Sequence, residues 1–161
     1  MGSLHPDRLK FRWARINPDR PPGIHRPQHD GDCGWDLAAI HDIMIGPHEM
    51  VDIAINARIE LPPAYWAEMK ARSSIAKRGL QVDAGTIDNG YRGPLFVVCR
   101  NTLLSPLADD ISNNFIYIKA GERIAQLVFH RLHDLWDEEV DDIDTSGSSR
   151  GESAFGSTGR T

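Results

Sequence analysis

Cysteine and long apolar runs are scarce in this sequence. Its two cysteines, Cys33 and Cys99, lie far apart and form no CxxC pair, which is against both a disulfide framework and a zinc site. No apolar run approaches the roughly 20 residues that span a bilayer. The first residues carry charges where a signal peptide would be apolar. We therefore expect a cytoplasmic protein with no membrane partner.

An excess of positive charge is also missing. The chain has 18 Lys and Arg residues against 23 Asp and Glu, which gives a net charge of -5. An acidic chain is a poor binder of duplex nucleic acid, so direct nucleic-acid binding is not expected. The phosphate-binding signatures GxxxxGK and GxGxxG are absent as well. A bound phosphate must therefore be held in another way.

Short, evenly spaced strands dominate the 161 residues. Residues 51–60 alternate apolar and mainly polar side chains, and this period of two predicts a half-buried strand. Further strands are predicted at residues 9–16, 64–71, 94–100, 115–118 and 123–130. Only residues 132–140 show a weak helical periodicity. The pattern predicts one all-β domain, a barrel or sandwich of the jelly-roll kind.

The composition changes near residue 141. Residues 141–161 are rich in Gly, Ser and Asp and hold a single aromatic, Phe155. Such a segment cannot offset the entropy of its own ordering. We expect residues 1–140 to form the domain and residues 141–161 to form a flexible C-terminal arm. That arm is either a solvated tail or a lid that orders over a ligand.

A candidate anion site lies in ARSSIAKRGL, residues 71–80. Arg72, Ser73 and Ser74 fall where a short helical turn can begin, so a guanidinium, two hydroxyls and free backbone N–H groups can meet one anion. Plain helix capping is the alternative. Gln126 lies among apolar residues on a predicted strand. Its amide needs a partner, which is either backbone or ligand.

Residues 85–93, GTIDNGYRG, predict a β-hairpin with a tight turn at Asn89 and Gly90 and a returning strand that carries Tyr91. A plain hairpin does not account for Asp88, a carboxylate that follows an apolar residue and precedes the turn. A carboxylate in that position can polarise a water molecule. Asp88 is therefore a candidate general base.

Five segments, taken in order, resemble the motifs of the dUTPase family. They are DCGWDL at 32–37, ARSSIA at 71–76, GTIDNGYRG at 85–93, GERIAQLVF at 121–129 and RGESAFGSTG at 150–159. The resemblance implies the dUTPase fold, a homotrimer, and Mg²⁺-dependent hydrolysis of dUTP to dUMP and pyrophosphate. Such an enzyme keeps uracil out of DNA and supplies dUMP for dTMP synthesis. The resemblance also implies that the arm closes over the active site of a neighbouring subunit.

The matching residues take their roles from the resemblance. Asp88 would activate the attacking water as the catalytic residue, and Tyr91 would pack under the deoxyribose and exclude a ribose 2′-hydroxyl. Asp36 would hold Mg²⁺, generally through water. The other substrate contacts would be Arg72, Ser73, Ser74 and Gln126 at the phosphates, Asp83, Gly85, Thr86 and Ile87 at the base, and Arg150, Phe155, Gly156 and Ser157 in the arm.

Asp83 departs from the pattern, because it stands where relatives often have an Asn. A carboxylate accepts a hydrogen bond from N3–H of uracil but cannot donate one to O4. Either the main chain alone reads the base, or Asp83 points away from it.

Two other functions stay open. dCTP deaminase shares the fold and an RSS segment, but there a glutamate lies five residues after the glycine that matches Gly93. That position is Val98 in this sequence, which leaves deamination without an evident proton carrier. A catalytically silent regulatory trimer would leave Asp88 without a use. The predicted loop at residues 103–114 is a possible site for a regulatory protein partner.

Overall fold

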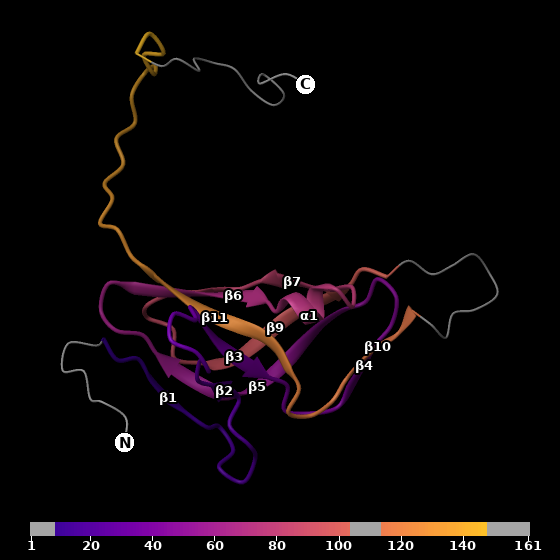
Figure 1. The fold of residues 1–161 in the computed structure, drawn as a ribbon. Helices are drawn as coiled ribbons and strands as arrows, with labels where there is room; N and C mark the ends of the chain where they lie inside the picture. Colours follow the sequence, from indigo (N-terminus) through magenta and orange to yellow (C-terminus); the bar gives the residue numbers. More distant parts are fainter. Residues whose placement is uncertain (1–8, 104–113, 148–161) are drawn as a thin grey trace.

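The structure is a computed structural model, and it describes residues 9–103 and 114–147 (Figure 1). Its strands form a four-stranded sheet with order β1-β5-β9-β7, a five-stranded sheet with order β2-β3-β11-β6-β8, and a two-stranded ribbon of β10 and β4. All strand pairs are antiparallel. The elements are β1 (Arg12–Ala14), β2 (Ile24–His25), β3 (Gly34–Ala38), β4 (Ile43–Ile45), β5 (Met50–Glu60), β6 (Tyr65–Ala71), α1 (Ser73–Ala76), β7 (Leu80–Ala84), β8 (Thr86–Ile87), β9 (Pro94–Asn101), β10 (Ile116–Ile118) and β11 (Arg123–Arg131).

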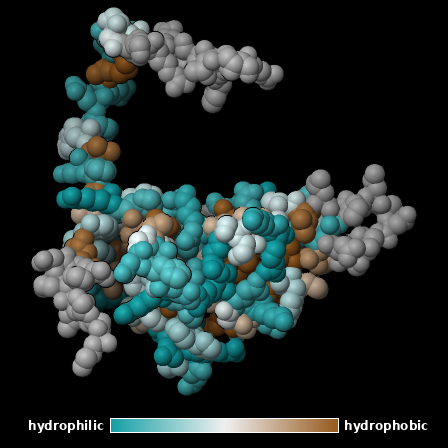
Figure 2. All heavy atoms as spheres, viewed as in Figure 1, coloured by the Kyte–Doolittle hydropathy of each residue, from teal (hydrophilic) through white to brown (hydrophobic). Residues whose placement is uncertain are grey.

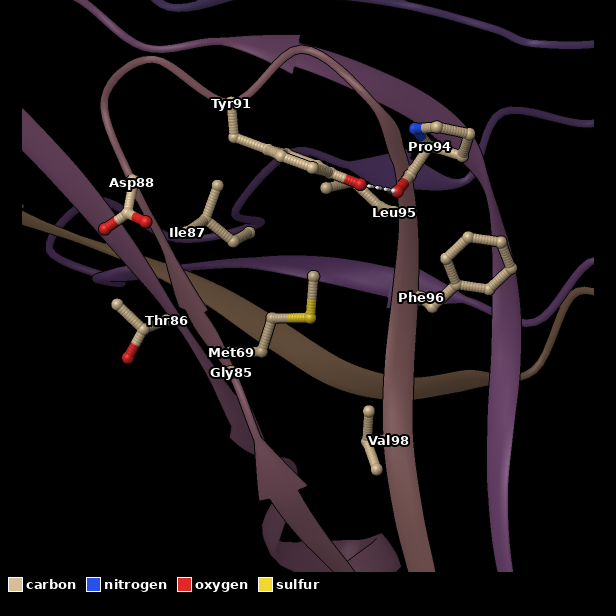
Figure 3. Close-up of a pocket in the computed structure, with 10 residues that line it drawn as sticks. All are labelled: Met69, Gly85, Thr86, Ile87, Asp88, Tyr91, Pro94, Leu95, Phe96 and Val98. Carbon is tan, nitrogen blue, oxygen red and sulfur yellow. Dashed lines mark hydrogen bonds between the residues drawn. The ribbon is translucent and has the colours of Figure 1, made fainter.

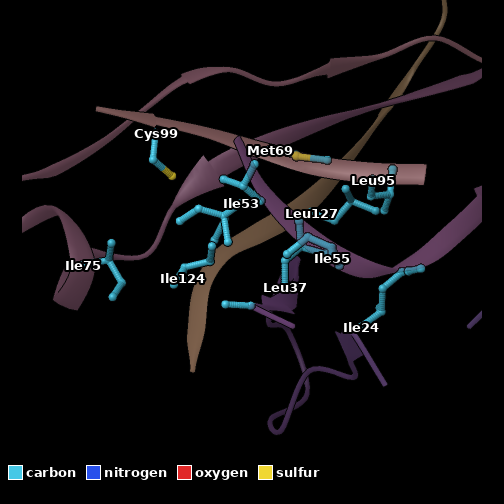
Figure 4. Packing of buried hydrophobic residues seen from close by; sticks show 14 of the residues in the cluster. Ile24, Leu37, Ile53, Ile55, Met69, Ile75, Leu95, Cys99, Ile124 and Leu127 are labelled. Atoms are coloured by element: carbon cyan, nitrogen blue, oxygen red, sulfur yellow. The ribbon is translucent and has the colours of Figure 1, made fainter. Parts of the chain in front are cut away.

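The core lies between the two larger sheets, where their inward side chains form one cluster. Ile55 and Leu95 come from the four-stranded sheet, whereas Leu37 and Leu127 come from the five-stranded sheet (Figure 4). All four are almost completely buried. Because side chains alternate between the two faces of a strand, each sheet keeps a second face outside this core. The predicted all-β class is confirmed.

Most predicted strands are present with small changes at their ends. Residues 51–60 form β5, and the strands predicted at 64–71, 94–100 and 123–130 are β6, β9 and β11. Of the strand predicted at residues 9–16, only the three residues of β1 form a strand. The weak helical periodicity at residues 132–140 does not produce a helix. These residues are exposed, so a helix would have had no apolar surface to pack against.

The predicted hairpin at residues 85–93 was also wrong. β8 pairs with β6 of the five-stranded sheet, whereas β9 pairs with β5 and β7 of the other sheet. Tyr91 lies in the loop between β8 and β9. The chain crosses between the sheets at Gly85, whose carbonyl accepts a hydrogen bond of 2.8 Å from the Met69 N–H. A Cβ on Gly85 would lie 2.6 Å from the Met69 carbonyl oxygen, so only glycine permits this approach.

The chain leaves the sheets after β11 and continues as an extended segment (Figure 1). Leu135 is 86% exposed and Trp136 is 96% exposed, and apolar residues stand out along this segment among hydrophilic ones (Figure 2). Within residues 9–103 and 114–147, no helix is long and apolar enough to cross a membrane. The division of the chain at residues 140 and 141 stays a prediction.

Candidate active site

A largely apolar pocket lies where the two sheets meet beside the crossing at Gly85 (Figure 3). It is lined by Met69, Gly85, Thr86, Ile87, Asp88, Tyr91, Pro94, Leu95, Phe96 and Val98. One wall therefore comes from β6 and β8 of the five-stranded sheet, and the other comes from β9 of the four-stranded sheet. We call it the nucleoside pocket, after the base and sugar contacts that the sequence resemblance implies for Gly85, Thr86, Ile87 and Tyr91.

The rim of the nucleoside pocket is fixed by hydrogen bonds. The Asn89 amide donates to the carbonyls of Pro62 and Tyr65, at 2.7 Å each. The Tyr91 hydroxyl donates to the Pro94 carbonyl at 2.7 Å, which holds the ring across the pocket (Figure 3). The Asp88 side chain is exposed and has no hydrogen bond or ion pair with any described residue. A fixed ring thus lies beside a carboxylate that is free to bind water.

A second, polar pocket lies on the outer face of the five-stranded sheet. Its functional groups come from β3, α1 and β11, and its lining includes Asp32, Cys33, Gly34, Asp36, Arg72, Ser73, Ser74, Arg123 and Gln126. The predicted helical turn is present as α1, which begins directly after Arg72. The two Ser hydroxyls therefore lie beside the guanidinium, as an anion site requires. We call this hollow the phosphate pocket.

Asp36 holds the two guanidiniums of the phosphate pocket in place. Its Oδ1 lies 3.0 Å from Nε of Arg72, and its Oδ2 accepts a hydrogen bond of 3.2 Å from Nη1 of Arg123. Arg72 also donates from Nη1 to the Arg123 carbonyl at 3.2 Å. The two guanidiniums are thus fixed side by side, and a pair of this kind can bind a phosphate, although Asp32 and Asp36 also line the pocket.

Arg123 was not singled out from the sequence. It lies at the start of β11, opposite Ala38 of β3, and so comes within reach of Asp36. Only the pairing of β3 with β11 places it there. The alternation within GERIAQLVF gives no sign of it.

Gln126 faces the phosphate pocket from β11, directly opposite Asp36 in the ladder. The neighbouring Gly34 leaves room for its amide. A Cβ on Gly34 would overlap the Gln126 Oε1 and lie 2.9 Å from Cδ. The glycine of DCGWDL is thus explained by the position of the Gln126 side chain.

His25 adds no positive charge to this region at neutral pH. It pairs with Asp36 across β2 and β3. Burial, followed by the nearby Arg123 guanidinium, holds the pKa of the His25 imidazole below its ordinary value, against the opposing effect of Asp36. The imidazole is therefore neutral at pH 7, and Arg72 and Arg123 supply the cationic charge.

Residues 22–159 match the dUTPase family model. The chain belongs to the dUTPase family. It is 38% identical over 154 residues to the deoxyuridine 5'-triphosphate nucleotidohydrolase of Thermobifida fusca (strain YX), across 94% of this chain and 79% of that protein.

Solved dUTPase structures share the fold. A mutant dUTPase of Staphylococcus bacteriophage 80alpha with dUpNHpp superposes with a TM-score of 0.82 at 24% identity, over 95% of this chain and 100% of that chain. A mutant dUTPase of phage phi11 of S. aureus, which coordinates a structural Mg(II) ion, superposes with a TM-score of 0.72 at 20% identity, over 83% of this chain and 98% of that chain.

Within one chain, the residues matched to dUTPase motifs fall into two separate groups. Gly85, Thr86, Ile87, Asp88 and Tyr91 line the nucleoside pocket. Asp36, Arg72, Ser73, Ser74 and Gln126 line the phosphate pocket, and none of the residues that the structure describes lines both. Asp83 lines neither, because its carboxylate accepts a hydrogen bond from Arg100. Arg150, Phe155, Gly156 and Ser157 lie outside the described residues.

Proposed function

We propose that this chain hydrolyses dUTP to dUMP and pyrophosphate, and thereby keeps uracil out of DNA and supplies dUMP for dTMP synthesis. The observation that carries the proposal is the Asp88 carboxylate, which has no partner among the described residues and lies beside a fixed aromatic ring, in a chain that also has a polar pocket with two arginines. The activity named for the Thermobifida relative supports the same substrate.

Asp88 is the general base. Its carboxylate accepts a proton from a water molecule, whose oxygen attacks the α-phosphorus. The bond from that phosphorus to the bridging oxygen breaks, and pyrophosphate leaves. A positioned base of this kind contributes about 10²- to 10⁴-fold in rate. The carboxylate is exposed and has no partner within residues 9–103 and 114–147, so it is available for this proton transfer.

Tyr91 determines which sugar is accepted. Its hydroxyl is tied to the Pro94 carbonyl, so the ring cannot easily turn out of the pocket. A Cβ on Gly93 would come 2.5 Å from the Tyr91 hydroxyl oxygen, which shows how closely the ring lies over this loop. A deoxyribose fits against such a ring, whereas the 2′-hydroxyl of a ribose collides with it.

The triphosphate is held by Arg72, Ser73, Ser74 and Gln126, with Arg123 supplying further positive charge. Asp36 fits an outer ligand of Mg²⁺, because its two oxygens already contact guanidiniums and a hydrated ion can still bind through water. Mg²⁺ needs few protein ligands when substrate phosphates also coordinate it. When bound, the ion would neutralise charge on the phosphates.

The two pockets are separate within one chain, because no described residue lines both. We infer a homotrimer in which the nucleoside pocket of one chain faces the phosphate pocket of another, in keeping with the assembly that the resemblance to dUTPases implies. The arm at residues 141–161, with Arg150, Phe155, Gly156 and Ser157, would then close over a neighbouring site.

dCTP deamination is disfavoured by the position of Val98. Its side chain lines the nucleoside pocket, at the position where the deaminase has a glutamate. Among the lining residues, only Asp88 and Tyr91 can titrate, so the pocket has no second carboxylate for proton transfer at the base.

The test is pyrophosphate release from dUTP, dCTP, dTTP and UTP, with ammonia measured in parallel. We expect release from dUTP, much less from the other three nucleotides, and no ammonia. Asp88→Asn is the control that keeps the fold and removes the base. Ammonia formed from dCTP would replace the proposal with deamination, and no turnover of any nucleotide would favour a silent trimer.

A further inference from the structure

The edge of the nucleoside pocket contains a β-bulge. Along β7 and β9 the pairs run from Gln81 with Arg100 to Val82 with Cys99, and then to Ala84 with Val98. Asp83 is therefore an extra residue without a partner in the ladder, and a bulge of this kind re-aims the local backbone. The bulge adjoins the pocket, because Val98 lines the pocket and pairs with the residue after Asp83.

The bulge exposes main-chain atoms. Asp83 is an exposed residue, yet its side chain retains only 18% exposure. Its open surface is therefore mostly backbone. The carbonyl of Gly85, by contrast, already accepts from Met69. The exposed main chain of the bulge therefore offers backbone donors and acceptors at this edge of the pocket.

Arg100 fixes the Asp83 side chain from the neighbouring strand. Its Nε donates to Oδ2 of Asp83 at 2.8 Å, although its backbone lies opposite Gln81. Phe96, Val98 and Arg100 alternate along one face of β9, so the pair continues the wall of the pocket. An exposed ion pair adds little to folding stability. This pair does fix the direction of the carboxylate, because the hydrogen bond ties Oδ2 of Asp83 to the neighbouring strand.

We propose that Arg100 is a positioning residue that determines base selectivity: its ion pair with Asp83 holds the bulge so that main-chain groups meet the edge of uracil. The inference rests on the proposed dUTP hydrolysis. Uracil presents N3–H as a donor and O4 as an acceptor, whereas cytosine presents the opposite pattern at both positions. A fixed main-chain carbonyl and N–H therefore accept uracil and leave cytosine unpaired.

Loss of Arg100 would free the Asp83 carboxylate to move and would also leave the backbone of the bulge less fixed. An unpaired Asp83 side chain beside the base would repel the acceptor oxygen of uracil, but it would attract the amino group of cytosine. Both effects change the preference in the same direction, away from uracil.

The experiment compares full-length wild type with Arg100→Ala and a matched control, Arg12→Ala. Arg12 is also an exposed arginine of the four-stranded sheet that pairs with a carboxylate, Glu60, but it lies outside both pockets. We measure kcat and KM for dUTP and dCTP, and the binding of dUMP and dCMP by calorimetry. For Arg100→Ala we expect the preference for uracil to fall about tenfold, the value of one hydrogen bond. The change should appear mainly in KM, with an unaltered melting temperature.

Two further variants distinguish a positioning role of Arg100 from a general role in the stability of the fold. Arg100→Lys keeps a cation for Asp83 and should keep most of the preference. Asp83→Asn in the Arg100→Ala background removes the repelling charge and should restore part of it.

An unchanged preference in Arg100→Ala, an equal loss in Arg12→Ala, or a wild type that binds dUMP and dCMP alike would overturn the inference. Wild type that binds dUMP selectively but releases no pyrophosphate from dUTP would instead overturn the proposed hydrolysis alone.

Discussion

Gly34→Ala should weaken substrate binding without weakening the fold. The new Cβ would overlap the Gln126 Oε1 and lie 3.1 Å from the Gln126 Cβ, so the amide must turn away from the phosphate pocket. The backbone at Gly34 is ordinary strand, where Ala in place of Gly is favourable by roughly 0.5–1 kcal/mol. The lost hydrogen bond to a charged phosphate is worth roughly 1.5–3 kcal/mol. That corresponds to about 10- to 100-fold in kcat/KM.

The assay is a double-mutant cycle. Steady-state pyrophosphate release and melting temperature are measured for wild type, Gly34→Ala, Gln126→Ala and the double variant. Gln126→Ala removes the amide that the new methyl would overlap and leaves only the contact of 3.1 Å with the Cβ at position 126, so Gly34→Ala should cost much less activity in that background. An equal loss in both backgrounds, or a lowered melting temperature that tracks the lost activity, would refute the steric account.

Further predictions concern the base, the sugar, the assembly and the thiols. Asp88→Asn should retain dUTP affinity while kcat falls about 10²-fold or more; a near wild-type kcat would remove it as the base. Tyr91→Ala should narrow the ratio of kcat/KM for dUTP over UTP, and an unchanged ratio would contradict the steric role. Asp88→Asn co-refolded with a chain that ends at Asp144 should recover about a quarter of wild-type activity, since a shared site needs one intact part from each of two chains; activity no higher than either parent would sink the shared site. A thiol reagent should modify exposed Cys33 but not Cys99 in the folded protein, because burial raises the pKa of the Cys99 thiol to about 12; rapid modification of both would refute this.

The sequence predicts single strands better than it predicts their partners. The alternation at residues 51–60 reflects local sequence and the burial of one face of the strand. It therefore predicts the bounds of β5 closely. β8 and β9 follow one another in the chain but pair with different sheets. Nothing in GTIDNGYRG signals that separation except Gly85, whose approach to Met69 is visible only once both sheets are in place.

Residues of the candidate site were likewise predicted where they depend on local sequence and missed where they depend on strand pairing. Ser73 and Ser74 were predicted at the start of a helical turn because such turns depend on local sequence, and α1 begins at Ser73, although no side chain caps it. Arg123 and Arg100 were not found, because each acts through a residue on a neighbouring strand. β3 was not predicted as a strand, since it is only five residues long and contains Gly34 and Asp36, two residue types that are rare in strands.

The crossing at Gly85 gives the nucleoside pocket one wall from each sheet. Met69 belongs both to that pocket and to the core between the sheets. A core substitution that moves the sheets apart or together would therefore change the width of the slot for the base. In a search for variants with altered nucleotide preference, we expect some successful changes to lie in the hydrophobic interior, where they would be mistaken for mutations that affect stability alone.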